Sequence, residues 1–174
     1  ADLAGSTALT RDEFLAADSG NYPGPVGDTN HVILNGTYFL SPSSLYQGGT
    51  FAFEITPYWL DEVTANEEKL NPNVSEDDVA TSAQLVFSPQ WFQVLRSTDL
   101  TMPLSVAYTI QGNAPIAQGG DEDLGNASIG LDFLYNQLWN FTFRYNAFFG
   151  DYDKGGAGLL NDRDNVSFTI KRAF

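Results

Sequence analysis

Seven stretches of this chain alternate between apolar and polar residues at every second position. A period of two predicts β-strands with unlike faces, because successive side chains of a strand point to opposite sides of its sheet. The first stretch places Val32, Leu34 and Tyr38 on one face, against Asn35 and Thr37 on the other. The other six stretches begin near residues 50, 84, 102, 127, 141 and 166. The chain is therefore predicted to be all-β.

The length and composition of these stretches favour strands that cross a membrane. A tilted strand needs about 9–11 residues to cross a bilayer, and the stretches have about that length. One face is large and apolar, whereas the other carries mainly hydroxyls and amides. Charged residues make up 17% of the chain, below the roughly 25% of soluble domains. We expect the apolar face to contact lipid and the polar face to line a wet lumen.

The links between the stretches alternate strictly in length. Short links are predicted around residues 41–49, 96–99 and 137–139, and long links over residues 61–80, 112–125 and 150–162. Outer-membrane barrels combine tight periplasmic turns with long external loops. This pattern predicts an external loop or N-terminal segment over residues 1–28, and transmembrane β-barrel strands and loops over residues 29–174.

The odd number of strands adds a further requirement. Bacterial single-chain barrels have even strand numbers, and an open sheet edge within lipid leaves backbone groups unpaired at high cost. The predicted fold is therefore an antiparallel transmembrane β-barrel section of about seven strands, completed by further strands not in this sequence. Those strands belong either to the same polypeptide or to a partner chain.

Polar residues at the alternate positions are the candidate lumen lining. They are His31, Asn35, Glu54, Gln84, Gln90, Asp132, Arg144, Asn146 and Lys171. If the last short hairpin is centred on Leu138, Asp132 and Arg144 lie directly opposite each other. Such a pair is either a structural cross-strand ion pair or part of a polar constriction that contacts a ligand.

Aromatic residues are concentrated near the predicted strand ends, where membrane barrels carry aromatic girdles. The predicted girdle comprises Trp59, Trp91, Trp139, Tyr135, Phe149 and Phe174.

Charge and residue types argue against several other classes of protein. The formal net charge is −14, which disfavours nucleic-acid binding because phosphate contacts need clustered Lys and Arg. His31 is the only His, no Ser near it has a recognisable nucleophile context, and Cys is absent. We therefore expect no enzyme and no catalytic residue.

Acidic clusters in the long links are the only candidate cofactor sites. They are Glu76–Asp78, Asp121–Asp123, and Asp151 with Asp153. Oxygen-rich loops can hold a divalent cation, although solvated loop charge explains the same clusters. No other cofactor is expected.

The end of the chain, Asn165–Phe174, resembles the terminal strand that outer-membrane assembly machinery recognises, with Arg172 as a departure from the pattern. Further segments resemble the C-terminal half of a proteobacterial outer-membrane β-barrel family catalogued as a domain of unknown function. These segments are Val26–Thr29, Gly48–Thr50, Pro89–Leu95, Leu100–Leu104 and Leu160–Ser167.

The resemblance implies a longer parent protein with no established catalytic residues. Genes of that family lie beside those of a periplasmic lipoprotein-like family and of a resistance-nodulation-division export pump. The resemblance therefore implies handling of lipids or hydrophobic compounds.

Together these features predict a protein of the cell outer membrane that lines a lumen for passage or binding of hydrophobic small molecules or lipids. The alternative is a structural or docking barrel, or a surface receptor, without transport activity. Expected partners are outer-membrane lipid and lipopolysaccharide, the remaining barrel strands and a periplasmic lipoprotein.

Overall fold

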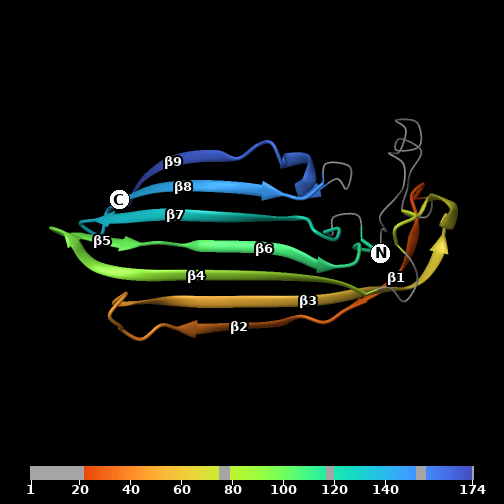
Figure 1. Cartoon of the computed structure of the whole chain (residues 1–174), viewed down its shortest axis with the longest axis horizontal. Coiled ribbons are helices and arrows are strands. Elements are labelled where there is room, and N and C mark those ends of the chain that lie inside the picture. Colours follow the sequence, from red (N-terminus) through yellow and green to blue (C-terminus); the bar gives the residue numbers. More distant parts are fainter. Residues whose placement is uncertain (1–21, 75–78, 117–119, 152–155, 174) are drawn as a thin grey trace.

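The chain forms one antiparallel β-sheet in a computed structural model that describes residues 22–74, 79–116, 120–151 and 156–173 (Figure 1). Its strands are β1 (Val26–His31), β2 (Leu34–Phe39), β3 (Gly48–Ala65), β4 (Val79–Leu95), β5 (Thr98–Thr101), β6 (Leu104–Gln111), β7 (Gly125–Tyr135), β8 (Trp139–Phe149) and β9 (Asn165–Arg172). Two short 3₁₀ helices, η1 (Glu67–Lys69) and η3 (Gly156–Leu160), lie in the links. The all-β antiparallel prediction is confirmed. No described helix is both long and apolar enough to cross a membrane.

The nine observed strands correspond to the seven predicted ones, because two predicted strands are interrupted. β1 and β2 are separated at Val32 and Ile33, opposite Pro57, which has no N–H for the ladder. The amide of Val32 still donates to the carbonyl of Pro57 at 3.0 Å. β5 and β6 are separated at Pro103, whose carbonyl accepts a 2.8 Å hydrogen bond from the amide of Gly130. Each interruption therefore occurs at or opposite a proline, which has no N–H group to donate to the neighbouring strand.

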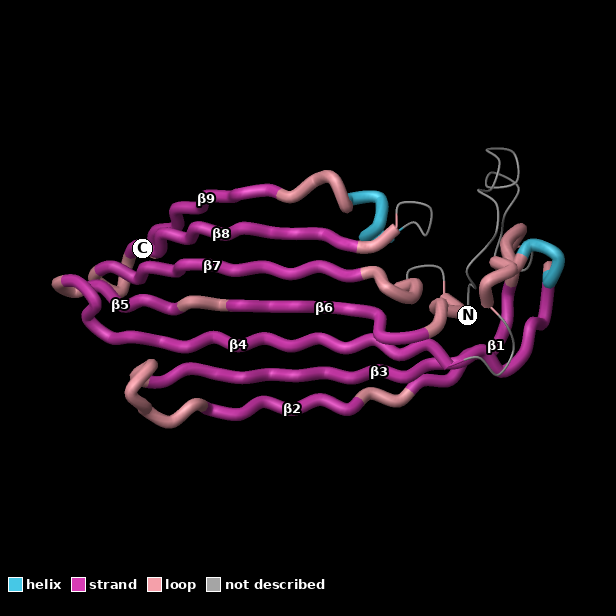
Figure 2. The backbone as a smooth tube through the Cα atoms, viewed as in Figure 1, coloured by secondary structure: helices cyan, strands magenta, loops and turns pink. Residues whose placement is uncertain are grey.

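Consecutive strands lie side by side in an up-and-down arrangement. β1 and β2 follow one side of β3, and β5 and β6 fill the space between β4 and β7. The short links 40–47, 96–97 and 136–138 lie at one end of the sheet, and the described parts of the long links 66–78, 112–124 and 150–164 lie at the other (Figures 1 and 2). The predicted alternation of link lengths is confirmed.

The sheet is longer at the long-link end than the sequence pattern predicts. β1 begins at Val26, before the predicted boundary at residue 29, and pairs with β3 as far as Ala65. Leu60 and Val74 form a small buried core there, with Val63 and Leu70 packed against it. This closed apolar packing lies at one end of the sheet, away from its middle.

β4 contains an irregularity near its C-terminal end. The register with β5 shifts between Trp91 and Leu95, and Gln93 has a φ of 53°. The amide of Gln93 donates instead to Oδ1 of Asp99 at 2.9 Å. A positive φ at a non-glycine residue marks a bulge that redirects the strand end.

The expected direct pairing of Asp132 with Arg144 is wrong. β7 and β8 pair Asp132 with Thr142, and Arg144 with Gly130. The hairpin turns around Gln137 because Asn136 and Gln137 both adopt positive φ, at 52° and 56°. When the centre of a hairpin moves by one residue, the partner of each strand residue moves by two positions. Asp132 and Arg144 are therefore diagonal neighbours and not a directly opposed pair.

The sheet has two open edges within the described residues. β1 and β2 pair only with β3, and β9 pairs only with β8, so no described strand joins β9 to β1 or β2. The edge backbone groups therefore have no ladder partner in this part of the chain.

Gly49 offers a test of the β3–β4 pairing. Its φ is +135°, and an added Cβ would lie 2.2 Å from the backbone oxygen of Ser88. We expect Gly49→Ala to lower the free energy of unfolding by about 1–3 kcal/mol, measured from the urea midpoint of the intact protein. Gly48→Ala is the matched control, because its Cβ would meet only the Phe92 ring at 3.9 Å. Equal midpoints for the two variants would contradict the observed pairing.

Candidate functional site: the polar face and its recesses

Cross-strand register brings the polar residues of all the strands onto one face of the sheet. One row across this face comprises Thr37, Ala52, Val86, Ser105, Ser128, Asn146 and Asn165. Within it, Ser105 and Ser128 share a 2.8 Å hydrogen bond, and Asn146 donates to Asn165 at 2.9 Å. The residues predicted to line a lumen all lie at strand positions that face this side of the sheet. They are His31, Asn35, Glu54, Gln84, Gln90, Asp132, Arg144, Asn146 and Lys171.

The opposite face is apolar and uncovered. One of its rows comprises Tyr38, Phe51, Phe87, Leu104, Ile129, Tyr145 and Val166. Ile129 and Phe143 lie on inner strands, yet they expose 44% and 46% of their surfaces. The described residues contain no second sheet that packs on this face. An extended exposed apolar surface is typical of a region that contacts a membrane or another protein.

At the short-link end, aromatic residues mark the margin of the apolar face. Trp91, Tyr135 and Trp139 lie there, and the indole nitrogen of Trp91 donates to the carbonyl of Leu45 at 2.7 Å. The guanidinium of Arg172 lies 5.2 Å from the centroid of the Trp139 ring. Arg172, the departure from the terminal-strand pattern, thus rests on an aromatic ring at the end of the sheet.

At the long-link end, Trp59 and Phe149 occupy the corresponding margin. Phe149 packs on Tyr108 with 5.8 Å between ring centroids, and the Tyr108 hydroxyl donates to Asp123 at 2.7 Å. The predicted girdle residues therefore fall at both ends of the apolar face, except Phe174, which lies outside the described residues.

A recess of about 530 Å³ opens on the polar face near the long-link end. Its lining comprises Thr29, Asn30, His31, Thr56, Tyr58, Ser82, Pro115, Ile116 and Gly120. The Tyr58 hydroxyl lies 3.0 Å from Oγ of Ser82, which lies 3.2 Å from Oγ1 of Thr109. Pro115 and Ile116 add apolar surface beside this chain of hydroxyls. The recess suits a molecule with both apolar and hydrogen-bonding parts.

The link from β6 to β7 folds back against the polar face beside this recess. The amide of Thr109 donates to the carbonyl of Leu124 at 2.9 Å, and the amide of Asp123 donates to the carbonyl of Thr109 at 3.2 Å. An added Cβ at Gly120 would lie 2.2 Å from Oγ1 of Thr109, so Gly120 lies directly against this polar-face side chain. The link therefore occupies space in front of the sheet.

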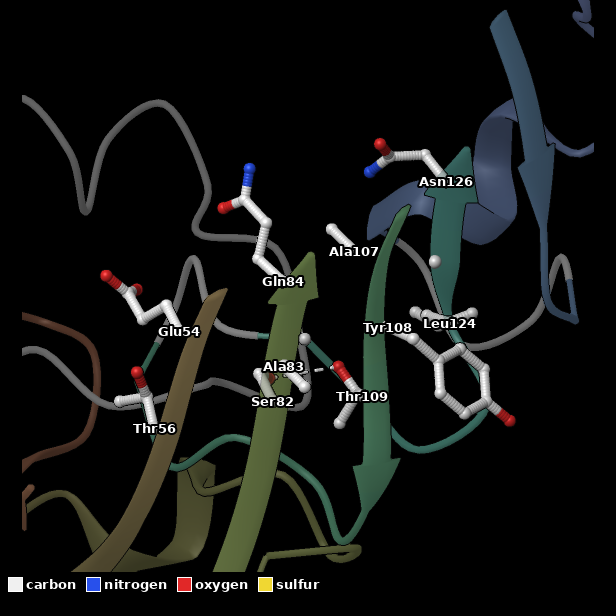
Figure 3. A pocket seen from close by; sticks show the side chains of 12 residues that line it. Glu54, Thr56, Ser82, Ala83, Gln84, Ala107, Tyr108, Thr109, Leu124 and Asn126 are labelled. Atoms are coloured by element: carbon white, nitrogen blue, oxygen red, sulfur yellow. Dashed lines mark hydrogen bonds between the residues drawn. The ribbon is translucent and has the colours of Figure 1, made fainter. Parts of the chain in front are cut away.

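A neighbouring recess of about 220 Å³ continues along the same face (Figure 3). Glu54, Gln84 and Asn126 project together from β3, β4 and β7, with Ala107 between the last two (Figure 3). A third recess, of about 260 Å³, extends from Glu54 and Gln84 toward Asn35 on β2. The recesses form a polar surface that runs across β2–β7.

A separate recess of about 480 Å³ lies over β7, β8 and β9. It is lined by Asp132, Asn140, Thr142, Arg144, Ser167, Thr169 and Lys171. Oδ1 of Asp132 and Nε of Arg144 are buried and lack a hydrogen-bond partner among the described residues. Asp132, Arg144 and Lys171 of the predicted set are thus brought together, whereas Glu54 and Gln84 lie in other recesses.

The recess that contains His31 also contains a serine, Ser82. His31 and Ser82 line the same recess, but no hydrogen bond joins them there, and the Ser82 hydroxyl contacts Tyr58 and Thr109 instead. No group of three His, Asp or Glu side chains suited to a metal ion occurs among the described residues. The predicted acidic clusters fall partly outside those residues, at Glu76–Asp78 and at Asp153.

Asp164 accepts two hydrogen bonds that the sequence pattern did not predict. Its Oδ2 accepts a 2.5 Å hydrogen bond from the hydroxyl of Tyr145, and its Oδ1 accepts a 3.0 Å bond from the amide of Phe148. The bond from Tyr145 and then the bond from Phe148 hold the pKa of Asp164 below its ordinary value. Asp164 thereby ties the last long link to β8.

Comparison with known proteins identifies the family of the chain. Residues 3–174 match a family described as "Protein of unknown function (DUF1302)", and the chain belongs to this family. No curated protein matches the chain. No solved structure matches it either.

The lowered pKa of Asp164 predicts a pH dependence. A carboxyl whose pKa is lower in the folded state stabilises that state above the unfolded pKa of about 3.9, and this stabilisation is lost as pH falls through the folded value. We expect the urea midpoint of the intact wild-type protein to fall more steeply below about pH 4 than that of Asp164→Asn. Asp162→Asn is the control, because Asp162 is 86% exposed and lies 3.7 Å from Nε of Arg163 at the surface. Parallel curves for Asp164→Asn and wild type would contradict the assigned hydrogen bonds.

Proposed function

We propose that this chain is a wall section of an outer-membrane β-barrel whose polar face lines a lumen for binding or passage of lipids or hydrophobic small molecules. The observation that carries the proposal is the pair of unlike faces, which continue from β2 to β9. One face is exposed and apolar, and the other is polar and recessed. A lipid-facing exterior and a wet interior are the two surfaces of such a barrel.

The ends of the sheet support the same orientation. All the long links lie at one end, and aromatic residues border the apolar face at both ends. In membrane barrels the long links are external, and aromatic rings lie at the level of the lipid head groups. We therefore place the long-link end outside the cell and the short-link end in the periplasm.

The open edges at β1, β2 and β9 support completion of the barrel by further strands. Unpaired edge groups within lipid have no water to satisfy them, so closure is required for a membrane location. The completing strands come from the same polypeptide or from a partner chain. The acidic long links provide a place for divalent cations shared with lipopolysaccharide, and the short-link end provides one for a periplasmic lipoprotein.

The recess near the long-link end supports a ligand that is not wholly polar. It sets Pro115 and Ile116 beside the hydroxyls of Tyr58 and Ser82. We propose binding or passage of ligands there, without catalysis, because no positioned nucleophile accompanies His31 among the described residues.

A docking barrel or surface receptor is the second candidate. The link from β6 to β7 folds over the polar face, which would narrow a lumen, and its residues Glu122 and Asp123 are exposed. A narrowed lumen with exposed acidic links suits recognition at the surface better than free passage.

Single-cysteine variants of the intact protein test the assignment of the faces, since this chain has no Cys of its own. We expect spin labels at Leu85→Cys and Ile129→Cys to collide preferentially with oxygen, which concentrates in lipid. Labels at the neighbouring positions Gln84→Cys and Ser128→Cys should collide preferentially with a water-soluble nickel chelate. Heat-modifiable gel mobility provides a check that each variant is folded. Loss of the alternation between neighbours would overturn the membrane assignment.

A flux measurement separates transport from docking. Ala107 is a small residue on the polar face, bordered by Gln84 and Asn126, and Val106 is its neighbour on the apolar face. We expect Ala107→Trp to slow solute flux into liposomes containing the intact protein, because the ring fills space in the lumen. Val106→Trp should leave the flux unchanged. Absence of flux in the wild type would favour the docking barrel.

A further inference from the structure

Two cations of the polar face line one recess near its β9 edge. Among the described strand residues, the Lys and Arg residues at positions on the polar face are Arg144 on β8 and Lys171 on β9. Both line the recess over β7–β9, and Asp132 is the one carboxylate in that lining. The recess therefore has two cationic groups against one acidic group, in a chain whose formal net charge is −14.

The surroundings of Arg144 include Gly130 and leave one atom of its guanidinium unpaired among the described residues. Gly130 lies directly opposite Arg144, and an added Cβ would lie 3.5 Å from its Nε and 3.0 Å from Cγ of Pro103. Nε is buried and has no acceptor among the described residues. Buried donors are ordinarily hydrogen-bonded, so an unpaired Nε is unusual. A guanidinium offers two parallel N–H groups, which match two oxygens of one oxyanion.

Further side chains that can donate hydrogen bonds line the same recess. Ser167 pairs with Arg144, Thr169 pairs with Thr142, and Lys171 pairs with Asn140 across β8 and β9. Ser167 and Thr169 supply hydroxyls, and the exposed ammonium of Lys171 supplies a mobile positive charge. Thr142 donates to Oδ1 of Asn140 at 2.8 Å, which orients that amide at the floor of the recess.

We propose that this recess binds an oxyanion, such as a carboxylate, sulfate or phosphate group. The guanidinium of Arg144 donates hydrogen bonds to two oxygens of the anion, and the ammonium of Lys171 adds positive charge from the open side of the recess. Asp132 opposes the anion, because its Oδ1 is buried in the same recess without a hydrogen-bond partner among the described residues. Asp132 therefore limits the affinity and favours release, as a route for passage requires.

The proposal identifies the ligand class of the polar face as molecules with an anionic head group. The oxyanion site depends only on the geometry of β7–β9. The inference that its natural ligand is an amphiphile, with an apolar part attached to the head group, rests on the proposed function.

Titration calorimetry on the intact, detergent-solubilised protein tests the site, with decanoate below its micellar concentration as the probe. Decanol, which has the same chain length without the charge, and inorganic phosphate, which has no apolar part, are the comparison probes. We expect Arg144→Gln and Lys171→Gln each to weaken decanoate binding about tenfold, the loss typical of one charge-assisted contact. Asp132→Asn should strengthen it, because the opposing charge is removed.

Glu54→Gln is the matched control, since Glu54 lies on the same face but lines other recesses. At physiological salt its distant charge is screened, and decanoate affinity should stay within about twofold of wild type. Because Lys171 is exposed, Lys171→Gln keeps the test decisive even if Arg144→Gln fails to fold.

The outcomes separate the two levels of the proposal. Equal affinity for decanoate and decanol, or no response to Lys171→Gln and Asp132→Asn, would overturn the oxyanion site. Phosphate binding as tight as decanoate binding would retain the site but overturn the amphiphilic ligand. Failure of the spin-label alternation with anion binding preserved would reject the membrane wall and leave the site intact.

Discussion

The cross-strand register is the constraint on which the rest of this structure depends. A strand presents its side chains alternately to two faces, so a slip of one residue between neighbours would exchange polar and apolar residues across a whole strand. From β2 to β9 the register keeps hydroxyls and amides on one face and large apolar groups on the other. The recesses, the aromatic margins and the clustered charges are all consequences of that alignment.

The alternation in the sequence was sufficient to predict the strands, their faces and the alternating link lengths. Period-two patterning is a local signal, and one face stays largely apolar from β2 to β9. The polar residues from His31 to Lys171 therefore fall on one face as expected. The family match over residues 3–174 agrees with the resemblance that the motifs indicated.

The missed features depend on backbone details or on contacts without periodicity. Asn136 and Gln137 both adopt positive φ, which moved the hairpin centre and the partner of Arg144. Pro57 and Pro103 interrupt the ladders of strands whose side-chain pattern continues without a break. The bond from Tyr145 to Asp164 and the return of the β6–β7 link onto Thr109 join a strand to a link, where no repeating pattern marks the contact.

The position of Arg144 above Gly130 links two residues that no local sequence pattern would connect. A Cβ at position 130 would lie 3.5 Å from Nε of Arg144, in van der Waals contact with the guanidinium. Substitutions at the two positions should therefore be non-additive, whereas substitutions at distant positions of the sheet should combine independently. The residue at position 130 thus affects which side chains can replace Arg144, although Gly130 itself has no side chain to contact a ligand. Divergence of ligand preference among related chains should show coupled changes at this pair.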